Sequence, residues 1–333
     1  MTIRPLLVML TVLALPATAC SPGGQAAFGR SASTGAAAPA APRGVVTVAE
    51  AESIFGQWEK AIKNAALQGG TDWTAAEAEL AAEISKAQSK VRKMIGESVS
   101  SSRKPIVKTR FAIPGKVAGA PWFMAEYSYK GVSGWWQAVF KKTSAGWRAV
   151  AYSATTSKSR PPTPARDKNG LATVVAPDDG NGLIASPRQI VQAHARLQST
   201  FGEDQRARRI FTANSRTRQN AKARVTDRKA LQGQWTMTIR PQPAPEIYAL
   251  RTSSGGALIW YGMRQQETFV ARPGTDTTMS FSTRHIAALS HGERFARKAV
   301  HKTAAIYLAV VPKSPGLVRV PAEWFTSVSV TGS

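Results

Sequence analysis

Arginine and lysine side chains are concentrated in one short segment of this 333-residue chain. Between Arg206 and Lys229, nine residues are basic and one is acidic. Arginine outnumbers lysine there, and its guanidinium group can hold a phosphate through two parallel hydrogen bonds. We therefore predict that this basic segment contacts a polyanion; a solvated basic face without a partner is the alternative. The predicted contact residues are Arg206, Arg208, Arg209, Arg216, Arg218, Arg224 and Arg228.

The chain as a whole is also strongly basic. Its 44 Lys and Arg residues against 20 Asp and Glu residues give a formal net charge of +24. Residues 156–333 alone carry 26 basic and 11 acidic side chains, a net charge of +15. Nucleic acid is the usual partner of such a surface, but the export signal described next places the protein outside the cytoplasm. The expected partners are therefore anionic lipid headgroups, phosphate-rich wall polymers or another protein of the cell envelope, and no nucleic acid.

Cys20 is the only cysteine, and its position gives the thiol a chemistry of its own. Residues 1–19 are typical of an export signal, with Arg4 as the positive start and an apolar run over residues 6–15. Residues 17–20, Ala-Thr-Ala-Cys, resemble a bacterial lipobox, in which the thiolate is alkylated by a diacylglyceryl group before cleavage. Two acyl chains hold a protein stably on a membrane. We therefore predict a lipoprotein signal peptide, a lipid on Cys20 and a position on the outer face of the cell membrane.

Cleavage by an ordinary signal peptidase is the alternative at this site. The small residues 17–19 also fit the rule for simple secretion, which would release a soluble protein with a free thiol. An unpaired thiol in a secreted protein needs a reason, and lipid attachment supplies one. The apolar run of about ten residues is too short for a membrane-spanning helix, which needs about 20.

Patterns for catalysis and metal binding are scarce. The four histidines show no ligand spacing, and neither a nucleotide-binding pattern nor G-x-S-x-G is present. His194 lies on the apolar face of a predicted helix, which is typical of a core residue. We therefore predict no catalytic residue, no metal site and no cofactor.

The composition divides the chain into two domains. Residues 20–45, rich in Gly, Ala, Ser and Pro, are predicted to form a flexible tether behind the lipid. A first domain is predicted over residues 46–156 and a second over residues 186–333. Each begins with a helix that has a capping-box pattern. Residues 157–185 return to Pro, Gly and Asp and are predicted to be the linker.

The first domain is expected to contain a helix from Thr47, a second helix over residues 73–95, and four strands. Period-two patterns separated by glycine-rich turns place these strands at 106–114, 122–130, 135–142 and 147–153. The stretches that begin at Phe111 and Met237 show the same order of strand, Pro/Gly loop, aromatic strand, turn and strand. This repetition predicts a structural duplication. Final strands are expected over 304–311 and 324–330.

A helix followed by a curved antiparallel sheet resembles the cystatin-like and NTF2-like architectures. The predicted fold class is thus α+β, with two tandem domains in which a helix packs on a curved sheet. The whole pattern, from the Cys20 motif and tether to the tryptophan-rich halves, resembles actinomycete lipoproteins that contain a domain of unknown function. That resemblance implies no catalytic residues. We expect a membrane-anchored, non-enzymatic module that binds a ligand or partner; an enzyme with an NTF2-like pocket and His194 as base is the alternative.

Overall fold

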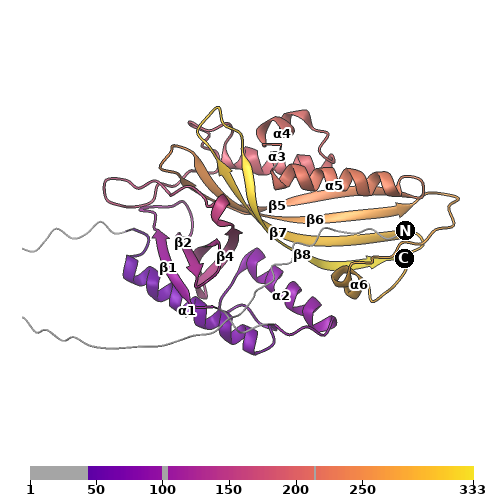
Figure 1. The fold of residues 1–333 in the computed structure, drawn as a ribbon, viewed down its shortest axis with the longest axis horizontal. Coiled ribbons are helices and arrows are strands. Elements are labelled where there is room, and N and C mark those ends of the chain that lie inside the picture. The colour runs from indigo at the N-terminus through magenta and orange to yellow at the C-terminus, as the bar shows by residue number, and fades with distance from the viewer. Residues whose placement is uncertain (1–43, 100–103, 214) are drawn as a thin grey trace, which may run out of the picture.

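The structure, a computed structural model, describes residues 44–99, 104–213 and 215–333. The predicted signal peptide, Cys20 and all but the end of the predicted tether lie outside these ranges. Two four-stranded antiparallel sheets, each with its strands in chain order, are accompanied by helices (Figure 1). The predicted α+β class with two tandem sheet domains is confirmed, and both sheets are open.

The first sheet is covered on one face by the helix α1 (Val48–Leu67). Its capping box forms as predicted: the Thr47 hydroxyl accepts from the N–H of Glu50, and the Glu50 carboxylate accepts from the N–H of Thr47. Phe55 and Trp58 on the buried side of the helix contact aromatic rings of the sheet. The following elements match the prediction closely: β1 (Ile106–Ala112), β2 (Trp122–Tyr129), β3 (Trp135–Thr143) and β4 (Gly146–Thr155), with a short 3-10 helix η1 (Ser157–Ser159) after them.

The strands of the second sheet are longer than those of the first, and the helices that precede β5 in the chain lie on one side of it (Figure 1). The helix α3 (Pro187–Ser199) begins at the second predicted capping box, where Ser186 and Gln189 each accept the other's backbone N–H. Its apolar face packs on the sheet. The other elements of this half are α4 (Gln205–Ile210), α5 (Arg216–Leu231), β5 (Trp235–Arg251), β6 (Ala257–Ala271), α6 (Arg284–Leu289), β7 (Lys298–Val311) and β8 (Arg319–Gly332).

The other face of the second sheet packs against the first half of the chain, so the two sheets share a hydrophobic core. The helix α2 (Glu79–Met94) was expected from the sequence, but its partner was not: Leu80 belongs to the same cluster as Trp260 of β6. Trp122 of β2 meets Tyr248 of β5 edge to face, with ring centroids 5.3 Å apart. Packing as well as chain connectivity therefore joins the two sheets.

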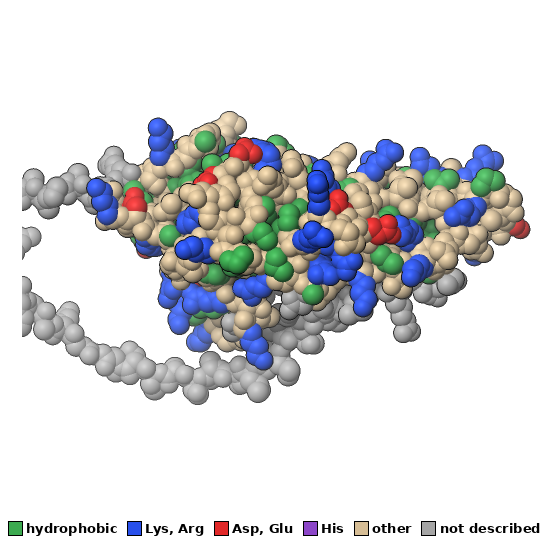
Figure 2. Space-filling model, turned by 90° about the horizontal axis from the view of Figure 1, so that it is seen from above, with side chains coloured by type: hydrophobic (Ala, Val, Ile, Leu, Met, Phe, Trp, Pro, Cys, Tyr) green, Lys and Arg blue, Asp and Glu red, His purple; other side chains and the backbone are tan. Residues whose placement is uncertain are grey.

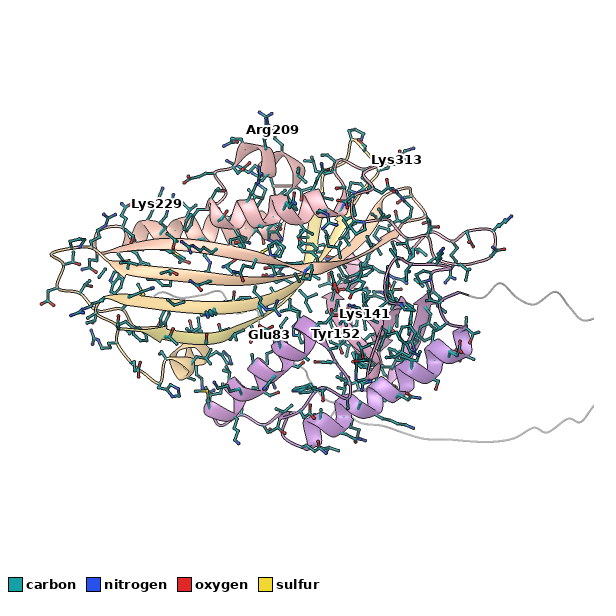
Figure 3. All side chains as sticks on the ribbon, turned by 180° about the vertical axis from the view of Figure 1, so that it is seen from behind. Glu83, Lys141, Tyr152, Arg209, Lys229 and Lys313 are labelled. Carbon is teal, nitrogen blue, oxygen red and sulfur yellow. The ribbon has the colours of Figure 1, made fainter. Side chains whose placement is uncertain are left out.

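Ion pairs lie around this shared core. Lys141 of β3 is 2.6 Å from Glu79 of α2 and 2.9 Å from Glu246 of β5. Burial by itself lowers the pKa of Lys141, but the hydrogen bonds to the two carboxylates outweigh it and raise the pKa. Arg264 of β6 pairs with Glu83 of α2 at 2.6 Å. These contacts fix α2 between the sheets, and Figure 3 labels Lys141 and Glu83 in the region where the two halves of the chain meet.

The segment 157–185, predicted to be the linker, is hydrogen-bonded to the edge of the second sheet. The N–H of Ala165 donates to the carbonyl of Arg251 at 2.7 Å, and the N–H of Val175 donates to that of Ala249 at 3.0 Å. Val175 is buried in the core beside α3. The connection thus lies along β5, while the boundaries of the two domains stay a prediction.

The predicted duplication is wrong in one place. Residues 241–245, expected to form a loop between two strands, lie inside the single long strand β5. Pro241 and Pro243 stay in register with Gln265 and Met263 of β6, and only Pro245 lies within the register shift between Pro243 and Ile247. Because β5 is the edge strand of its sheet, the missing proline N–H groups cost it no ladder hydrogen bonds. One bulged strand in the second half therefore takes the place that two strands occupy in the first.

Candidate functional site

The predicted polyanion-binding arginines lie on two consecutive helices above the second sheet. Three belong to α4 and four to α5. Each helix begins at a side-chain cap, because Asp204 accepts from the N–H of Ala207 and Ser215 accepts from the N–H of Arg218. The structure therefore places the basic segment on ordered helices on one side of the molecule (Figure 1).

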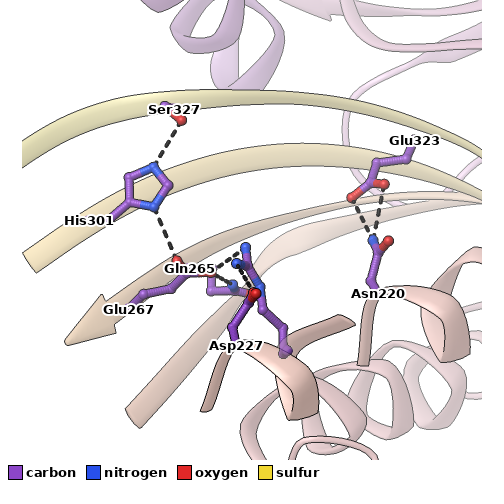
Figure 4. A network of polar contacts seen from close by, with 8 residues as sticks. Asn220, Asp227, Gln265, Glu267, His301, Glu323 and Ser327 are labelled. Atoms are coloured by element: carbon purple, nitrogen blue, oxygen red, sulfur yellow. Dashed lines mark hydrogen bonds and ion pairs between the residues drawn. The ribbon is translucent and has the colours of Figure 1, made fainter. Parts of the chain in front are cut away.

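The helix α5 differs from the other long helices in how it is held. Only Thr217 and Ala221 of its sixteen residues are buried, and Val225 and Leu231 are partly buried. A helix that lacks an apolar stripe gains little from hydrophobic burial, so polar contacts must fix it to the sheet. Those contacts form the network drawn in Figure 4.

Arg224 is the main link from α5 to the sheet. Its guanidinium group is 2.5 Å from Glu267 of β6 and 3.3 Å from Asp227 of its own helix. Burial alone would raise the pKa of Glu267, which is 1% exposed, but Arg224 and then His301 outweigh it and hold the pKa below its usual range. Glu267 is therefore a buried carboxylate that stays ionised because its partners compensate the charge.

The network continues from Glu267 across the sheet (Figure 4). Oε2 of Glu267 lies 3.1 Å from Nδ1 of His301, its cross-strand neighbour on β7, and Nε2 of His301 lies 2.8 Å from the hydroxyl of Ser327 on β8. Gln265 donates its side-chain amide to Oε1 of Glu267 at 2.9 Å. Three strands and one helix are thus joined by a continuous chain of polar contacts.

Serine, histidine and carboxylate follow one another here in the order of a nucleophilic triad. In a triad the carboxylate stabilises the histidine once it has taken the proton from serine. Here the cation of Arg224 faces the same carboxylate and weakens that stabilisation. The three residues are also 7, 3 and 1% exposed for Ser327, His301 and Glu267 respectively. We interpret the network as the anchor of α5.

A second anchor lies nearer the start of α5. The side-chain amide of Asn220 donates to both carboxylate oxygens of Glu323 on β8, at 3.3 and 3.1 Å. Tyr307, buried beside them on β7, has its pKa raised well above the usual value by burial and by Glu323. The two anchors fix the rotation of α5, and hence the direction in which its outer side chains point.

The predicted arginines separate into two groups. Arg224 has the anchoring role just described, and Arg228 contacts Glu203 at 2.5 Å while its guanidinium group stacks 4.4 Å above the ring of Phe201. The other five show no ion pair with an acidic side chain in the described part of the chain: Arg206, Arg208, Arg209, Arg216 and Arg218. Figure 2, seen onto this side of the molecule, shows many Lys and Arg side chains with few acidic ones between them.

His194 is a core residue, as the sequence predicted. It is fully buried, with Nδ1 2.7 Å from the hydroxyl of Tyr261 and Nε2 3.1 Å from the side-chain amide of Gln198. Burial lowers its pKa to about 3. A histidine sealed in this way cannot reach a substrate, which removes the basis for its role as a general base.

The anchoring residues had no visible signal in the sequence. Glu267, His301 and Ser327 lie on three different strands, and none of them forms a recognisable motif with its neighbours along the chain. The available signal was indirect. A helix as polar as α5, next to strands that carry isolated charged residues at inward positions, requires polar contacts between the two.

Comparisons with known proteins agree with the resemblance seen in the sequence. A family model described as a domain of unknown function (DUF8094) matches residues 42–331. An uncharacterised lipoprotein from Streptomyces avermitilis is 27% identical over 177 residues, which are 53% of this chain and 52% of that protein. The chain thus spans about half the length of this curated relative. The predicted likeness to actinomycete lipoproteins with a domain of unknown function is confirmed.

No solved structure matches the chain, so the cystatin-like and NTF2-like assignment stays a prediction. None of the helices in the described ranges combines the length and the hydropathy of a membrane-spanning segment.

Proposed function

The chain belongs to the family described as a domain of unknown function, DUF8094, and we propose that it is a lipoprotein held by its lipid on the outer face of the cell membrane. In this position it binds an anionic surface through α4 and α5. The proposed ligand class is the phosphate groups of lipid headgroups or wall polymers. No catalytic step is part of this proposal. The observation that carries it is the polar docking of α5, which leaves Arg216 exposed and Arg218 partly exposed on a fixed helix.

The proposed anchor is a diacylglyceryl group on Cys20. The only cysteine of the chain stands at the expected cleavage point, and the relative from Streptomyces avermitilis carries the name of a lipoprotein. The first buried residue of the folded body is Val46. Residues 21–43 would then separate the lipid from the body, and as a flexible chain they would reach on the order of 25–30 Å.

The proposed contact surface, which we call the outer arginines, consists of Arg206, Arg208, Arg209, Arg216 and Arg218. Arg224 and Arg228, also predicted from the sequence, are not part of this surface because they already form ion pairs with acidic side chains. Each basic residue close to an anionic bilayer contributes about 1 kcal/mol. Five such residues on one side of the body are enough for a measurable contribution to surface binding.

Vesicle co-sedimentation tests this proposal. The mature chain is produced without lipid as Cys20→Ser and mixed with vesicles of phosphatidylcholine, with or without phosphatidylglycerol. We expect binding only to the anionic vesicles, and we expect it to weaken steeply with salt, since the Debye length is about 8 Å at physiological ionic strength. At about 1 kcal/mol for each basic residue, the change of Arg208, Arg209, Arg216 and Arg218 to Gln should reduce affinity by at least about tenfold.

The control removes the same charge elsewhere. Lys108, Arg110, Lys116 and Lys130 are exposed in the first half, and their change to Gln lowers the net charge by the same four units. If both quadruple variants lose affinity equally, net charge alone explains the binding and the outer arginines are not a site. Absence of binding to anionic vesicles at low salt would contradict the proposal altogether.

A further inference from the structure

On the side of the second sheet away from α5, a groove lies between α2, the turn after α1 and β8. Its volume is about 430 Å³, within the range of small-molecule sites in proteins. Figure 3 shows Glu83 on α2 below the sheet, and Arg209 and Lys229 above it. The groove is therefore separate from the surface proposed above.

Two kinds of side chain line the groove. Ala87 and Val328 give it an apolar floor. Three lysines, Lys86, Lys90 and Lys93, stand along one side. Their spacing of four and three residues places them on one face of α2. The groove thus combines an apolar floor with a cationic rim.

Two carboxylates lie near these lysines, and both are already engaged. That of Asp72, which interacts with Lys86, accepts hydrogen bonds from the backbone N–H and the hydroxyl of Thr74, at 2.8 and 2.7 Å. Glu83 lines the same groove, but its carboxylate accepts two hydrogen bonds from Arg264, at 2.9 and 2.6 Å. Among the described residues, no ion pair joins Lys86, Lys90 or Lys93 to a carboxylate. Like charges at this spacing destabilise a helix. An anionic ligand in the groove would compensate them.

The wall opposite the lysines is held in place. The indole N–H of Trp73 donates to the carbonyl of Gly70 at 2.9 Å and to the hydroxyl of Ser89 at 3.1 Å. Gly70 packs so closely on α2 that a Cβ there would lie 2.4 Å from the Ser89 hydroxyl. At Gly69, by contrast, a Cβ would meet nothing within 4 Å. The turn is therefore fixed to α2 at Gly70, while the preceding residue, Gly69, faces open space.

We propose that this groove binds one acyl chain of an anionic amphiphile that has a phosphate headgroup, with the chain on the floor and the phosphate at the lysines. The hydrogen bonds that Ser89 and Glu83 already make favour a lipid over a peptide as the occupant. Ser89 already donates to the carbonyl of Ser85 at 2.8 Å and accepts from Trp73. With Glu83 also engaged, few hydrogen-bonding groups are left to hold a peptide backbone.

Titration calorimetry with three probes tests the proposal on the mature chain that carries Cys20→Ser. Dodecyl phosphate has both the chain and the charge, dodecyl maltoside has only the chain, and inorganic phosphate has only the charge. The two amphiphiles are used below their critical micelle concentrations. We expect one dodecyl phosphate per protein, and binding at least about tenfold weaker for the other two probes because each lacks one of the two contacts. Equal binding of dodecyl phosphate and either other probe would overturn the proposal.

Two variants locate the site. The triple change Lys86→Gln, Lys90→Gln and Lys93→Gln should weaken the binding of dodecyl phosphate by at least about tenfold. The control variant carries Lys108→Gln, Lys116→Gln and Lys130→Gln, which remove the same charge from the first half, and its affinity for dodecyl phosphate should be unchanged. Ala87→Leu, which fills the floor, should also weaken it. Unchanged affinity in the Lys86, Lys90 and Lys93 variant, with an unchanged thermal midpoint, would show that the groove is not the site. Since these titrations use a monomeric ligand, their outcome is independent of the vesicle experiment on the outer arginines.

Discussion

The indole N–H of Trp260, on β6 of the second sheet, donates a hydrogen bond of 3.0 Å to the hydroxyl of Ser153, on β4 of the first. Ser153 in turn donates to the side-chain carbonyl of Gln137 at 2.7 Å. All three groups are buried. The contact crosses the shared core, so its loss should destabilise both halves of the chain.

We therefore expect both halves to unfold in one transition. Ser153→Ala leaves the Trp260 N–H buried without a partner, which costs about 1–3 kcal/mol. Urea unfolding followed by circular dichroism and by tryptophan fluorescence should give coincident curves that shift together in the variant. Ser98→Ala, at an exposed serine, is the control. Two separate transitions, of which only one shifts, would instead support independent domains.

Removal of Arg224 should destabilise the protein through the carboxylate that it leaves behind. Breaking a buried ion pair costs about 3–5 kcal/mol, and because Arg224 is itself 28% exposed we expect about 2–3 kcal/mol for Arg224→Met. Arg216→Met, on the outer side of the same helix, should change stability by less than about 0.5 kcal/mol. Urea midpoints measure both values, and equal effects would contradict the anchoring role of Arg224.

Acid should weaken the Arg224–Glu267 link from a predictable pH. The pKa of Glu267 is lowered in the folded protein. The stability that its ionised carboxylate contributes is therefore fully present above the pKa of the unfolded chain, about 4.3, and is lost as the pH falls through the pKa of the folded protein. In Glu267→Gln that part of the acid dependence should disappear, at the cost of lower stability at neutral pH. Unfolding free energies measured from pH 6 to pH 3 would show the difference in slope, and parallel profiles would argue against an ionised Glu267.

His194 should make stability depend on pH in a higher window. Its folded pKa is about 3, below the unfolded value of about 6.5. Only the unfolded chain therefore takes up a proton as the pH falls between these values. Stability should decline by up to about 1.4 kcal/mol per pH unit in this window. His194→Gln should have a flatter profile from pH 7 to pH 5, and an unchanged slope would show that His194 is not the group responsible.

The lipid prediction is checked in the bacterial cell. Cys20→Ala should abolish lipid attachment and either release the protein from the membrane fraction or leave an uncleaved precursor. Mass spectrometry of the wild-type protein should show a diacylglyceryl group on Cys20. An unmodified cysteine in a protein found in the culture fluid would support ordinary secretion instead.

The elements of the first half could be predicted because local signals agreed. Thr47 and Glu50 mark the start of α1, and glycine-rich turns bound the aromatic strands β2 and β3. The position of α2 could not be predicted, because its apolar face does not reveal which sheet it covers. One clue was present in β2, where Trp122 to Ala125 are all apolar. Such a run is typical of a strand buried on both faces, as this one is.

The candidate site could be predicted only in part. The basic segment is visible as composition, but the division between anchoring and outer arginines depends on the rotation of α5. That rotation is set by Glu267 and Glu323, which lie about 40 and 100 residues further along the chain. In β5, the prolines predict a loop because proline usually interrupts a strand, whereas an edge position tolerates it.

The prolines of β5 also affect how copies of the protein meet. An edge strand with free backbone groups is a template on which another chain can add a strand. Pro241 and Pro243 lack N–H donors, and the register shift after Pro243 bends the strand. Further along, the segment that contains Ala165 and Val175 already occupies the edge. Copies brought together on one membrane by the proposed lipid would therefore find the β5 edge closed to sheet extension, which removes one route to aggregation.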